Sequence, residues 1–197
     1  GIVSGRVTPS GRLPVSLPRS AGAQPFTYLH PRLGGRSDIT SADPTPVRPF
    51  GFGLTYTTFA YEDLRVASHA GTGEGVTATV TVRNTGAVAA TDVVQLYGHD
   101  IVGTTTRPMA QLLAYERVPL GPGETATVEF RVPPARLAYT GRDGVRAVEP
   151  GRVDLWVGSS SGERQATGSV EFTGEAYVIG PDDARLATAS VLEGAAL

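Results

Sequence analysis

From residue 57 onward, apolar and polar residues alternate along the chain with a period of two. The clearest segment runs from Val76 to Arg83, where valine or alanine alternates with threonine or arginine. Because successive side chains of a strand point to opposite faces of a sheet, this pattern predicts a strand with one buried face. A slip between Tyr61 and Leu64 in the first alternating segment indicates a β-bulge. The predicted strands cover residues 59–66, 76–83, 93–97, 112–120, 125–132, 153–157 and 169–173.

Turn-forming residues separate these alternating segments. They include Asn84-Thr85-Gly86, Gly121-Pro122-Gly123 and Glu149-Pro150-Gly151, in which glycine and proline favour tight turns. Residues 133–137 predict a short helical turn that crosses between sheets, and the alanine-rich residues 183–195 predict a terminal helix. About seven short strands at regular spacing, with no long helical segments between them, are typical of an all-β antiparallel sandwich of the immunoglobulin type.

Residues 1–50 differ from the rest because they show no long periodic pattern and contain eight of the fifteen prolines. Proline lacks a backbone donor, so this segment predicts an extended arm with little internal hydrogen bonding. Residues 12–17 are the candidate for a short edge strand. Since the arm cannot bury a core of its own, it must lie on another surface. The chain thus divides into an arm (1–50), a sandwich (51–174) and a C-terminal tail (175–197), and we expect residues 57–174 to unfold cooperatively.

Charge and composition narrow the classes of function. The 17 basic and 19 acidic residues give a net charge of −2, with no basic stripe of the kind that binds nucleic acid. No apolar run reaches the roughly 18 residues that a membrane-spanning helix needs. The absence of cysteine excludes disulfides and thiolate metal sites, and it leaves secreted and cytoplasmic locations both open. Every basic residue is an arginine, which we attribute to a bacterial, GC-rich genome.

One stretch, Pro49-Phe50-Gly51-Phe52-Gly53-Leu54-Thr55-Tyr56-Thr57-Thr58-Phe59, joins the proline-rich arm to the first predicted strand. Four further blocks follow the same order as in a known family. They are Val7 to Pro14, Gln24 to Tyr28, Val82 to Gly86 with Asp92 to Tyr97, and Tyr115 to Glu124 with Val148 to Gly151 and Val157 to Ser160. Together the five blocks resemble the C-terminal part of glycoside hydrolase family 3, the retaining exo-acting β-glycosidases. Residues 175–197 match none of the family's motifs.

The resemblance implies a fibronectin type III-like sandwich preceded by the end of an α/β sandwich domain. In the family, an aspartate nucleophile and a glutamate acid/base lie in the other domains and perform a two-carboxylate retaining mechanism. No residue here matches either motif, so we assign no catalytic, cofactor-binding or metal-binding residue and expect the chain alone to be inactive. Its implied role is that of an accessory and stabilising region of a β-glucosidase or β-xylosidase, whose partners are the upstream catalytic domains.

Aromatic residues beside glycine and proline are the candidates for contact between domains. We predict this packing role for Tyr28, Phe50, Phe52 and Tyr56. The alternative is that these side chains, together with Trp156, stack on sugar rings. A corresponding alternative function is an independent carbohydrate-binding or adhesive module. An exposed row of aromatics on one sheet face would favour it, whereas the one tryptophan, Trp156, lies in an alternating strand and is expected in the core.

Four weaker patterns have simpler explanations. His99-Asp100 could orient a base or a metal, but adjacent strand residues point to opposite faces, so we expect a solvated strand end. The glycine-rich residues 71–75 precede a strand rather than a helix, and residues 158–162 lack the helix of a nucleophile elbow; both are expected to be loops. Asp182-Asp183 with Glu175 could bind a hard cation, but a solvated turn is the expectation. His30 and His69 stand alone in predicted loops.

Overall fold

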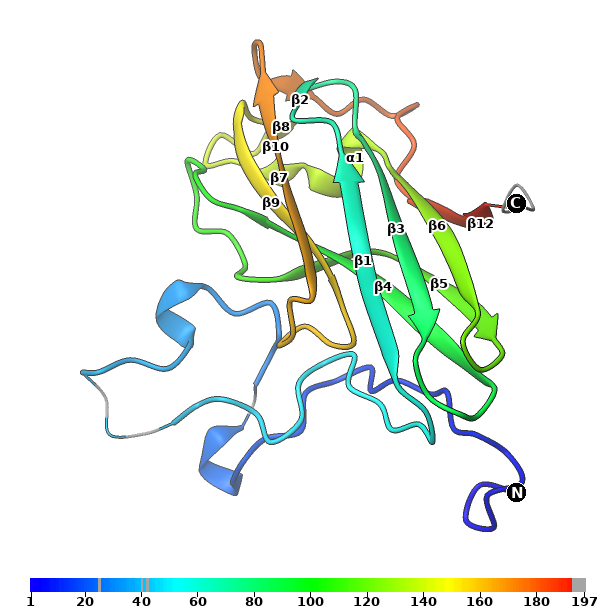
Figure 1. The fold of residues 1–197 in the computed structure, drawn as a ribbon. Coiled ribbons are helices and arrows are strands. Elements are labelled where there is room, and N and C mark those ends of the chain that lie inside the picture. Colours follow the sequence, from blue (N-terminus) through cyan, green and yellow to red (C-terminus); the bar gives the residue numbers. More distant parts are fainter. Residues whose placement is uncertain (25, 40, 42, 193–197) are drawn as a thin grey trace.

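The fold is a β-sandwich with a long arm lying across one end, as a computed structural model of residues 1–24, 26–39, 41 and 43–192 shows (Figure 1). The strands are β1 (Phe59–Val66), β2 (His69–Gly71), β3 (Val76–Asn84), β4 (Ala90–Asp100), β5 (Gln111–Leu120), β6 (Thr125–Val132), β7 (Tyr139–Thr140), β8 (Arg146–Val148), β9 (Gly151–Gly158), β10 (Ala166–Thr173), β11 (Tyr177–Val178) and β12 (Thr188–Leu192). The helical elements are the short α1 (Pro134–Leu137) and two 3-10 turns, η1 (Ala21–Ala23) and η2 (Arg32–Gly34). The architecture is the predicted all-β sandwich.

Two sheets form the layers of the sandwich. One has four strands in the order β1-β3-β6-β12, and all of its pairs are antiparallel. The other has five strands in the order β2-β10-β9-β4-β5, in which only β2 runs parallel to its neighbour. A small third sheet, β11-β8-β7, joins the loops at one end. The predicted helical turn is confirmed as α1.

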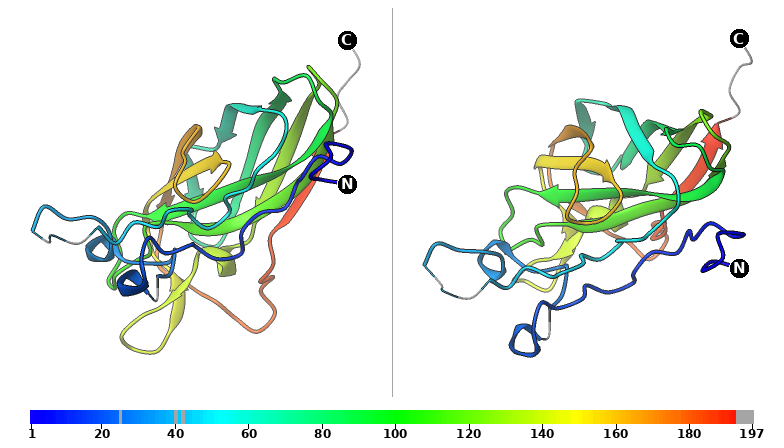
Figure 2. Two further views of the ribbon diagram at one scale, coloured as in Figure 1. Left: turned by 90° about the horizontal axis from the view of Figure 1, so that it is seen from below. Right: turned by 60° about the horizontal axis from the view of Figure 1, so that its bottom comes forward.

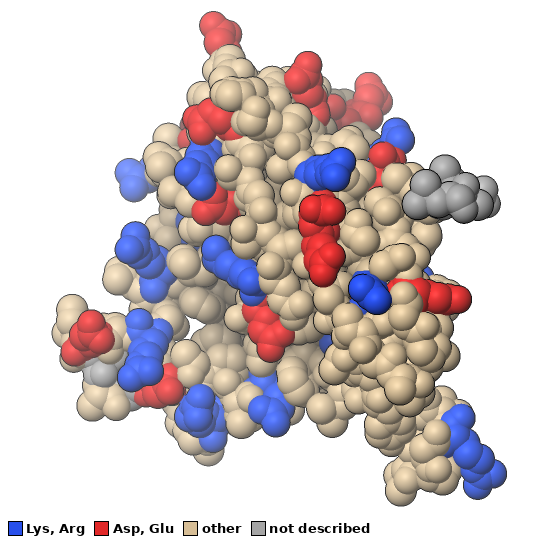
Figure 3. Space-filling view, in the orientation of Figure 1, with Lys and Arg blue, Asp and Glu red and all other residues tan. Residues whose placement is uncertain are grey.

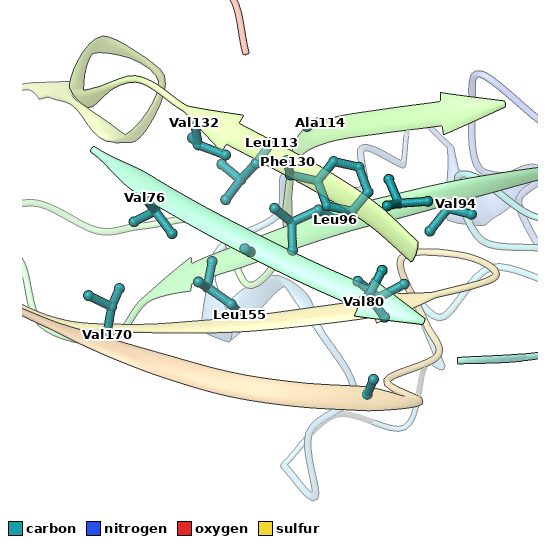
Figure 4. Close-up of a cluster of buried hydrophobic side chains, with 14 of the residues drawn as sticks. Val76, Val80, Val94, Leu96, Leu113, Ala114, Phe130, Val132, Leu155 and Val170 are labelled. Carbon is teal, nitrogen blue, oxygen red and sulfur yellow. The ribbon is translucent and has the colours of Figure 1, made fainter. Parts of the chain in front are cut away.

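The core lies between the two large sheets, as the alternation predicts. In β3, Ala78, Val80 and Val82 are fully buried, whereas the residues between them face outward or are half-buried. They pack against Leu96 of β4 and Leu155 of β9, among other apolar side chains of one continuous cluster (Figure 4). The period-two pattern therefore identified the inner faces of both sheets.

The first strand contains the irregularity that its sequence indicates. The pairing of β1 with β3 shifts register between Glu62 and Arg65, and Asp63 adopts a left-handed φ of 53°. A bulge at this point restores the inward direction of the apolar side chains after the slip. The predicted bulge is confirmed.

The predicted terminal helix is wrong where the structure describes it. Residues 188–192 form the strand β12, which pairs with β6 so that Ala189 lies opposite Phe130 and Val191 opposite Val128. Residues 193–195, the end of the predicted helix, lie outside the described residues. The open edge of β6 offers unpaired backbone groups to a segment that a helix would not satisfy. Alanine content alone therefore misled the prediction.

In the structure the arm comprises residues 1–58, because the first strand begins at Phe59. It is hydrogen-bonded within itself, contrary to the prediction. Its two halves run side by side: Leu13 N donates to Phe52 O at 2.8 Å, and Gly51 N donates to Leu13 O at 2.9 Å. The predicted strand at residues 12–17 reduces to one isolated antiparallel bridge between Leu17 and Arg48. Figure 2 shows the two halves, in blue and cyan, crossing the same end of the sandwich. None of the helices in the described part of the chain is long and apolar enough to cross a membrane.

Candidate interdomain surface

The arm covers an aromatic cluster on the outer face of the five-stranded sheet. Tyr97 of β4 and Trp156 of β9 are almost completely buried and lie stacked, with ring centroids 5.7 Å apart. Above them, Tyr28 and Phe50 of the arm stack on each other at 3.9 Å and 9°, and both pack against this cluster. Trp156 is a core residue, as predicted. Where the arm crosses β4 and β9, both faces of this sheet are therefore buried, one by the other sheet and one by the arm.

Polar groups of β4 fix the position of the arm. The buried side-chain amide of Gln95 donates to Gly51 O at 3.2 Å and to Ser159 O at 3.1 Å, and its oxygen accepts a hydrogen bond from the Tyr97 hydroxyl at 2.7 Å. Burial raises the pKa of Tyr97. Gly51 has a φ of 81°, and a side chain there would collide with Gln95 and Tyr97. The close approach of the arm thus depends on glycine at this position.

A second anchor lies where the arm passes the start of β4. The guanidinium of Arg12 forms an ion pair with the fully buried carboxylate of Asp92 and donates to Ser159 O at 3.2 Å. The Tyr61 hydroxyl donates to the other oxygen of Asp92 at 2.6 Å. Burial and the adjacent Asp92 carboxylate together raise the pKa of Tyr61. The buried charge is thereby paired and hydrogen-bonded, as burial of a carboxylate requires.

The four aromatic residues predicted to pack between domains divide into two pairs. Tyr28 and Phe50 face the sandwich of their own chain. Phe52 lies under the guanidinium of Arg48, 4.8 Å from it, and Tyr56 is 46% exposed with its hydroxyl donating to Ile2 O at 2.7 Å. Only the second pair is placed toward the outer side of the arm, and its contact with another domain stays a prediction.

The outer side of the arm carries an apolar groove, hereafter the arm groove, with a volume of about 700 Å³. It is lined by Ile2, Val7, Thr8, Pro9, Ser10, Gly11, Arg12, Leu13, Leu17, Arg48, Phe52, Gly53 and Leu54. Several of these side chains are largely in solvent; Ile2 is 50% exposed, Val7 53% and Leu54 71%. One surface of the arm is therefore anchored to the sandwich while the opposite surface exposes apolar residues.

The two anchoring residues of β4 carry no local motif that marks them as anchors. Asp92 and Gln95 flank valines in the run Asp92-Val93-Val94-Gln95-Leu96-Tyr97, and both are buried. A charged residue at the start of such an apolar strand was the available signal. The distance in sequence from Arg12 concealed its partner, since no local pattern connects residues so far apart.

The weaker candidates mostly form local contacts. His99 and Asp100 are half-buried rather than solvated, which corrects that expectation: His99 Nδ1 donates to Pro108 O at 2.7 Å, and Asp100 pairs with Arg107 at 3.2 Å. Burial raises the pKa of Asp100. Asp183 accepts hydrogen bonds from Tyr177 and from Gly180 N, so it stabilises a turn. The described residues contain no cluster of three or more metal-binding side chains.

Comparison with known proteins agrees with this geometry. Residues 92–161 match the fibronectin type III-like domain family. A β-xylosidase of Formosa agariphila is 38% identical over 81% of this chain and 23% of its own length. A periplasmic β-glucosidase of Salmonella typhimurium is 35% identical over 87% of this chain and 24% of its own length. The chain thus spans about a quarter of the length of these curated relatives.

Solved structures give the same correspondence. A β-glucosidase from Listeria innocua in complex with glucose superposes with a TM-score of 0.82 at 30% identity, over 90% of this chain and 26% of that one. A family 3 β-glucosidase from Bifidobacterium adolescentis gives 0.71 at 28% identity, over 87% and 27%. The molecule is therefore a fibronectin type III-like sandwich with an attached arm. It is similar to the C-terminal part of family 3 glycoside hydrolases, over about a quarter of the length of each relative.

Proposed function

We propose that this chain braces the catalytic domains of a retaining exo-acting β-glycosidase of the β-glucosidase or β-xylosidase type. The observation that supports the proposal best is the two-sided arm. Arg12, Gln95 and the stacked Tyr28 and Phe50 hold its inner side on the sandwich, and the arm groove is left open on its outer side. In this proposal the groove receives the neighbouring domain of the longer enzyme.

The energetics favour burial of the groove. Contacts between domains of one chain bury about 600–1,500 Å², and each Å² of apolar surface removed from water contributes roughly 25 cal/mol before ordering costs. Exposed Ile2, Val7 and Leu54 supply such apolar surface on the arm. The anchored arm loses little further conformational freedom on docking, because its backbone is already hydrogen-bonded. Docking of a neighbouring domain on the arm groove therefore costs little conformational entropy.

The chemistry of the reaction belongs to other domains in this proposal. The whole enzyme would hydrolyse a β-linked glycoside with two carboxylates, and this chain would supply stability rather than catalytic groups. Neither a nucleic acid nor a membrane is among the proposed partners. The chain alone is expected to give only background rates with chromogenic β-glucosides and β-xylosides, and turnover that a point substitution within it abolishes would contradict the proposal.

The alternative of an independent carbohydrate-binding or adhesive module has less support. Sugar-binding sheet faces present rows of exposed aromatics, whereas Trp156 and Tyr97 are buried under the arm. Among the described residues, the aromatics with the largest exposure are Tyr56 and Tyr115, which lie on the arm and on β5. A free-standing module also has no use for an arm with an open groove.

The test compares two exposed leucines in the polypeptide encoded together with its upstream region. Leu54 lines the arm groove and is 71% exposed, whereas Leu186 lies outside it and is 83% exposed. In the 197-residue chain, Leu54→Ser and Leu186→Ser should both leave the midpoint of thermal unfolding nearly unchanged. In the longer enzyme, only Leu54→Ser should lower the midpoint, because only that leucine becomes buried.

Two results would count against the bracing role. One is an upstream region without the family's barrel and nucleophile motif. The other is an equal response of the longer enzyme to the two substitutions, which would show that the groove stays in solvent.

A further inference from the structure

A second hollow lies on the sandwich, away from the arm groove, where three segments meet. These are the turn η2 of the arm, the loop after β4 and the loop between β7 and β8. The hollow, hereafter the arginine pocket, has a volume of about 530 Å³, which is large enough for a sugar. It is lined by Arg32, His99, Asp100, Ile101, Val102, Gly103, Thr104, Thr105, Thr106, Arg107, Met109 and Arg142.

The residues that line the arginine pocket carry more positive than negative charge. Arg107 pairs with Asp100 at 3.2 Å, donates to Leu137 O and lies 3.7 Å over the ring of Tyr139. Within the described part of the chain, the side chains of Arg32 and Arg142 have no hydrogen bond or ion pair, and both are exposed. The wall thus presents three guanidinium groups against one carboxylate, and that carboxylate is already paired. Figure 3 shows arginine side chains, in blue, exposed beside acidic side chains, in red, on the side of the molecule that carries the arm.

Two further carboxylates lie close by in the chain, and both accept hydrogen bonds from uncharged groups. Asp143 accepts a hydrogen bond from Val145 N at 3.0 Å. Glu149 accepts one from the Thr104 hydroxyl at 2.7 Å. Both line the neighbouring hollow beside β8 and β11, which Arg142 and Thr104 line as well. Within the described residues, neither carboxylate forms an ion pair with Arg32 or Arg142.

The rest of the wall favours a polar ligand that bears a charge. His99 donates through Nδ1 to Pro108 O, which leaves Nε2 as its unused ring nitrogen. Thr105 and Thr106 add hydroxyl groups, and Gly103 brings backbone close to the surface. No phenylalanine, tyrosine or tryptophan is among the lining residues, so a neutral sugar has none of these rings on which to stack. Guanidinium groups, in contrast, bind the oxygens of carboxylates and phosphates through charge-assisted hydrogen bonds.

We propose that the arginine pocket binds the oxyanion of a sugar-sized ligand, with Arg32 and Arg142 as the main recognition groups. The shared chemistry is a carboxylate or phosphate group on a pyranose, so a sugar acid and a sugar phosphate are the two possible sources. This site is separate from the arm groove and does not depend on the bracing role of the chain.

The experiment measures amide chemical shifts of the isotope-labelled 197-residue chain during titration with three probes. Glucuronate and glucose 6-phosphate carry the oxyanion, and glucose is the neutral control. Both anionic probes should shift resonances of residues 99–107 in a saturable way, and added salt should weaken the effect. Glucose should leave these resonances in place. The tighter of the two anionic probes identifies the source of the oxyanion.

Matched arginine variants assign the binding to the pocket. Arg32→Gln combined with Arg142→Gln should weaken binding of the better probe by about tenfold. Arg83→Gln removes one charge from an exposed position of β3 in the opposite sheet and should leave binding unchanged. Unaltered binding in the double variant, equal shifts with glucose, or no saturable shift with either anion would each overturn the proposal.

Discussion

Arg12 of the arm and Asp92 of β4 form an ion pair in which the carboxylate side chain is 0% exposed and the arginine side chain 15% exposed. The pair joins residues that are 80 positions apart in the sequence. Its carboxylate also accepts the hydroxyl hydrogen of Tyr61 inside the sandwich. The arm is thereby connected through one buried charge to the core of the domain.

Removal of the arginine should destabilise the chain strongly. In Arg12→Ala the Asp92 carboxylate remains buried without its cation, and loss of one partner of a buried pair costs about 3–5 kcal/mol. Urea denaturation of the 197-residue chain measures the free energy of unfolding. Arg152→Ala is the control, because Arg152 pairs with Asp154 at 2.9 Å but is 59% exposed, and such pairs contribute at most about 1 kcal/mol. Equal losses in the two variants would show that the Arg12 pair is no stronger than a surface contact.

The buried tyrosines should make the chain sensitive to alkaline pH. The pKa values of Tyr61 and Tyr97 are raised above the ordinary 10.0, chiefly by burial. Above pH 10 the unfolded chain therefore loses protons that the folded chain retains, so the free energy of unfolding falls as the pH rises. Above pH 10, two such groups give the free energy of unfolding a slope of about 2.7 kcal/mol per pH unit. Below pH 10 these two groups contribute no slope. Denaturation curves between pH 8 and about 11.5 measure this slope, and Tyr61→Phe should roughly halve it; an unchanged slope in that variant would exclude Tyr61 as a source.

A side chain at position 51 should release the arm from the sheet. Gly51 has a left-handed φ and faces Gln95 and Tyr97 in close contact, so Gly51→Ala adds both backbone strain and a steric clash, each about 1–3 kcal/mol. Hydrogen exchange should accelerate at the amides of Leu13, Leu17 and Gly51, which are bonded within the arm. Gly22→Ala is the control, because nothing lies within 4 Å of a Cβ added there. Unchanged exchange at these amides in Gly51→Ala would show that the sheet tolerates a displaced arm.

The strands could be predicted where one face of a segment meets the core. In β3 and β6, buried apolar residues such as Val80 and Val128 recur at every second position. The local sequence alone therefore predicts which face of each strand is buried. Ala189 and Val191 also stand on either side of the polar Ser190, but their strand exists only because β6 has an open edge to pair with. That open edge exists only once the sheet has assembled, so no local sequence pattern can predict it.

The surface on the arm was partly predictable for the same reason. The aromatic residues beside glycine indicated packing, and Phe50 does pack on a sheet. The particular sheet, and the role of Gln95 in fixing Gly51, follow from contacts between segments distant in sequence. The arm groove arises from the pairing of two proline-rich segments whose individual sequences predict no structure, so its apolar lining could not be recognised as one surface.

The last prediction concerns the C-terminal limit of the folding unit, which the sequence places at residue 174. The strand β12 lies beyond that limit and makes five cross-strand pairs with β6, of which Ala189 packs against the core. Cross-strand pairs contribute about 0.2–1 kcal/mol each, so deletion of residues 188–197 should lower the free energy of unfolding by about 1–5 kcal/mol while the transition stays two-state. Deletion of residues 193–197 alone is the control and should have little effect. If the longer deletion is also neutral, β12 is an appendage and residues 57–174 contain the whole cooperative unit; if unfolding ceases to be two-state, β12 is part of the core that the remaining strands need.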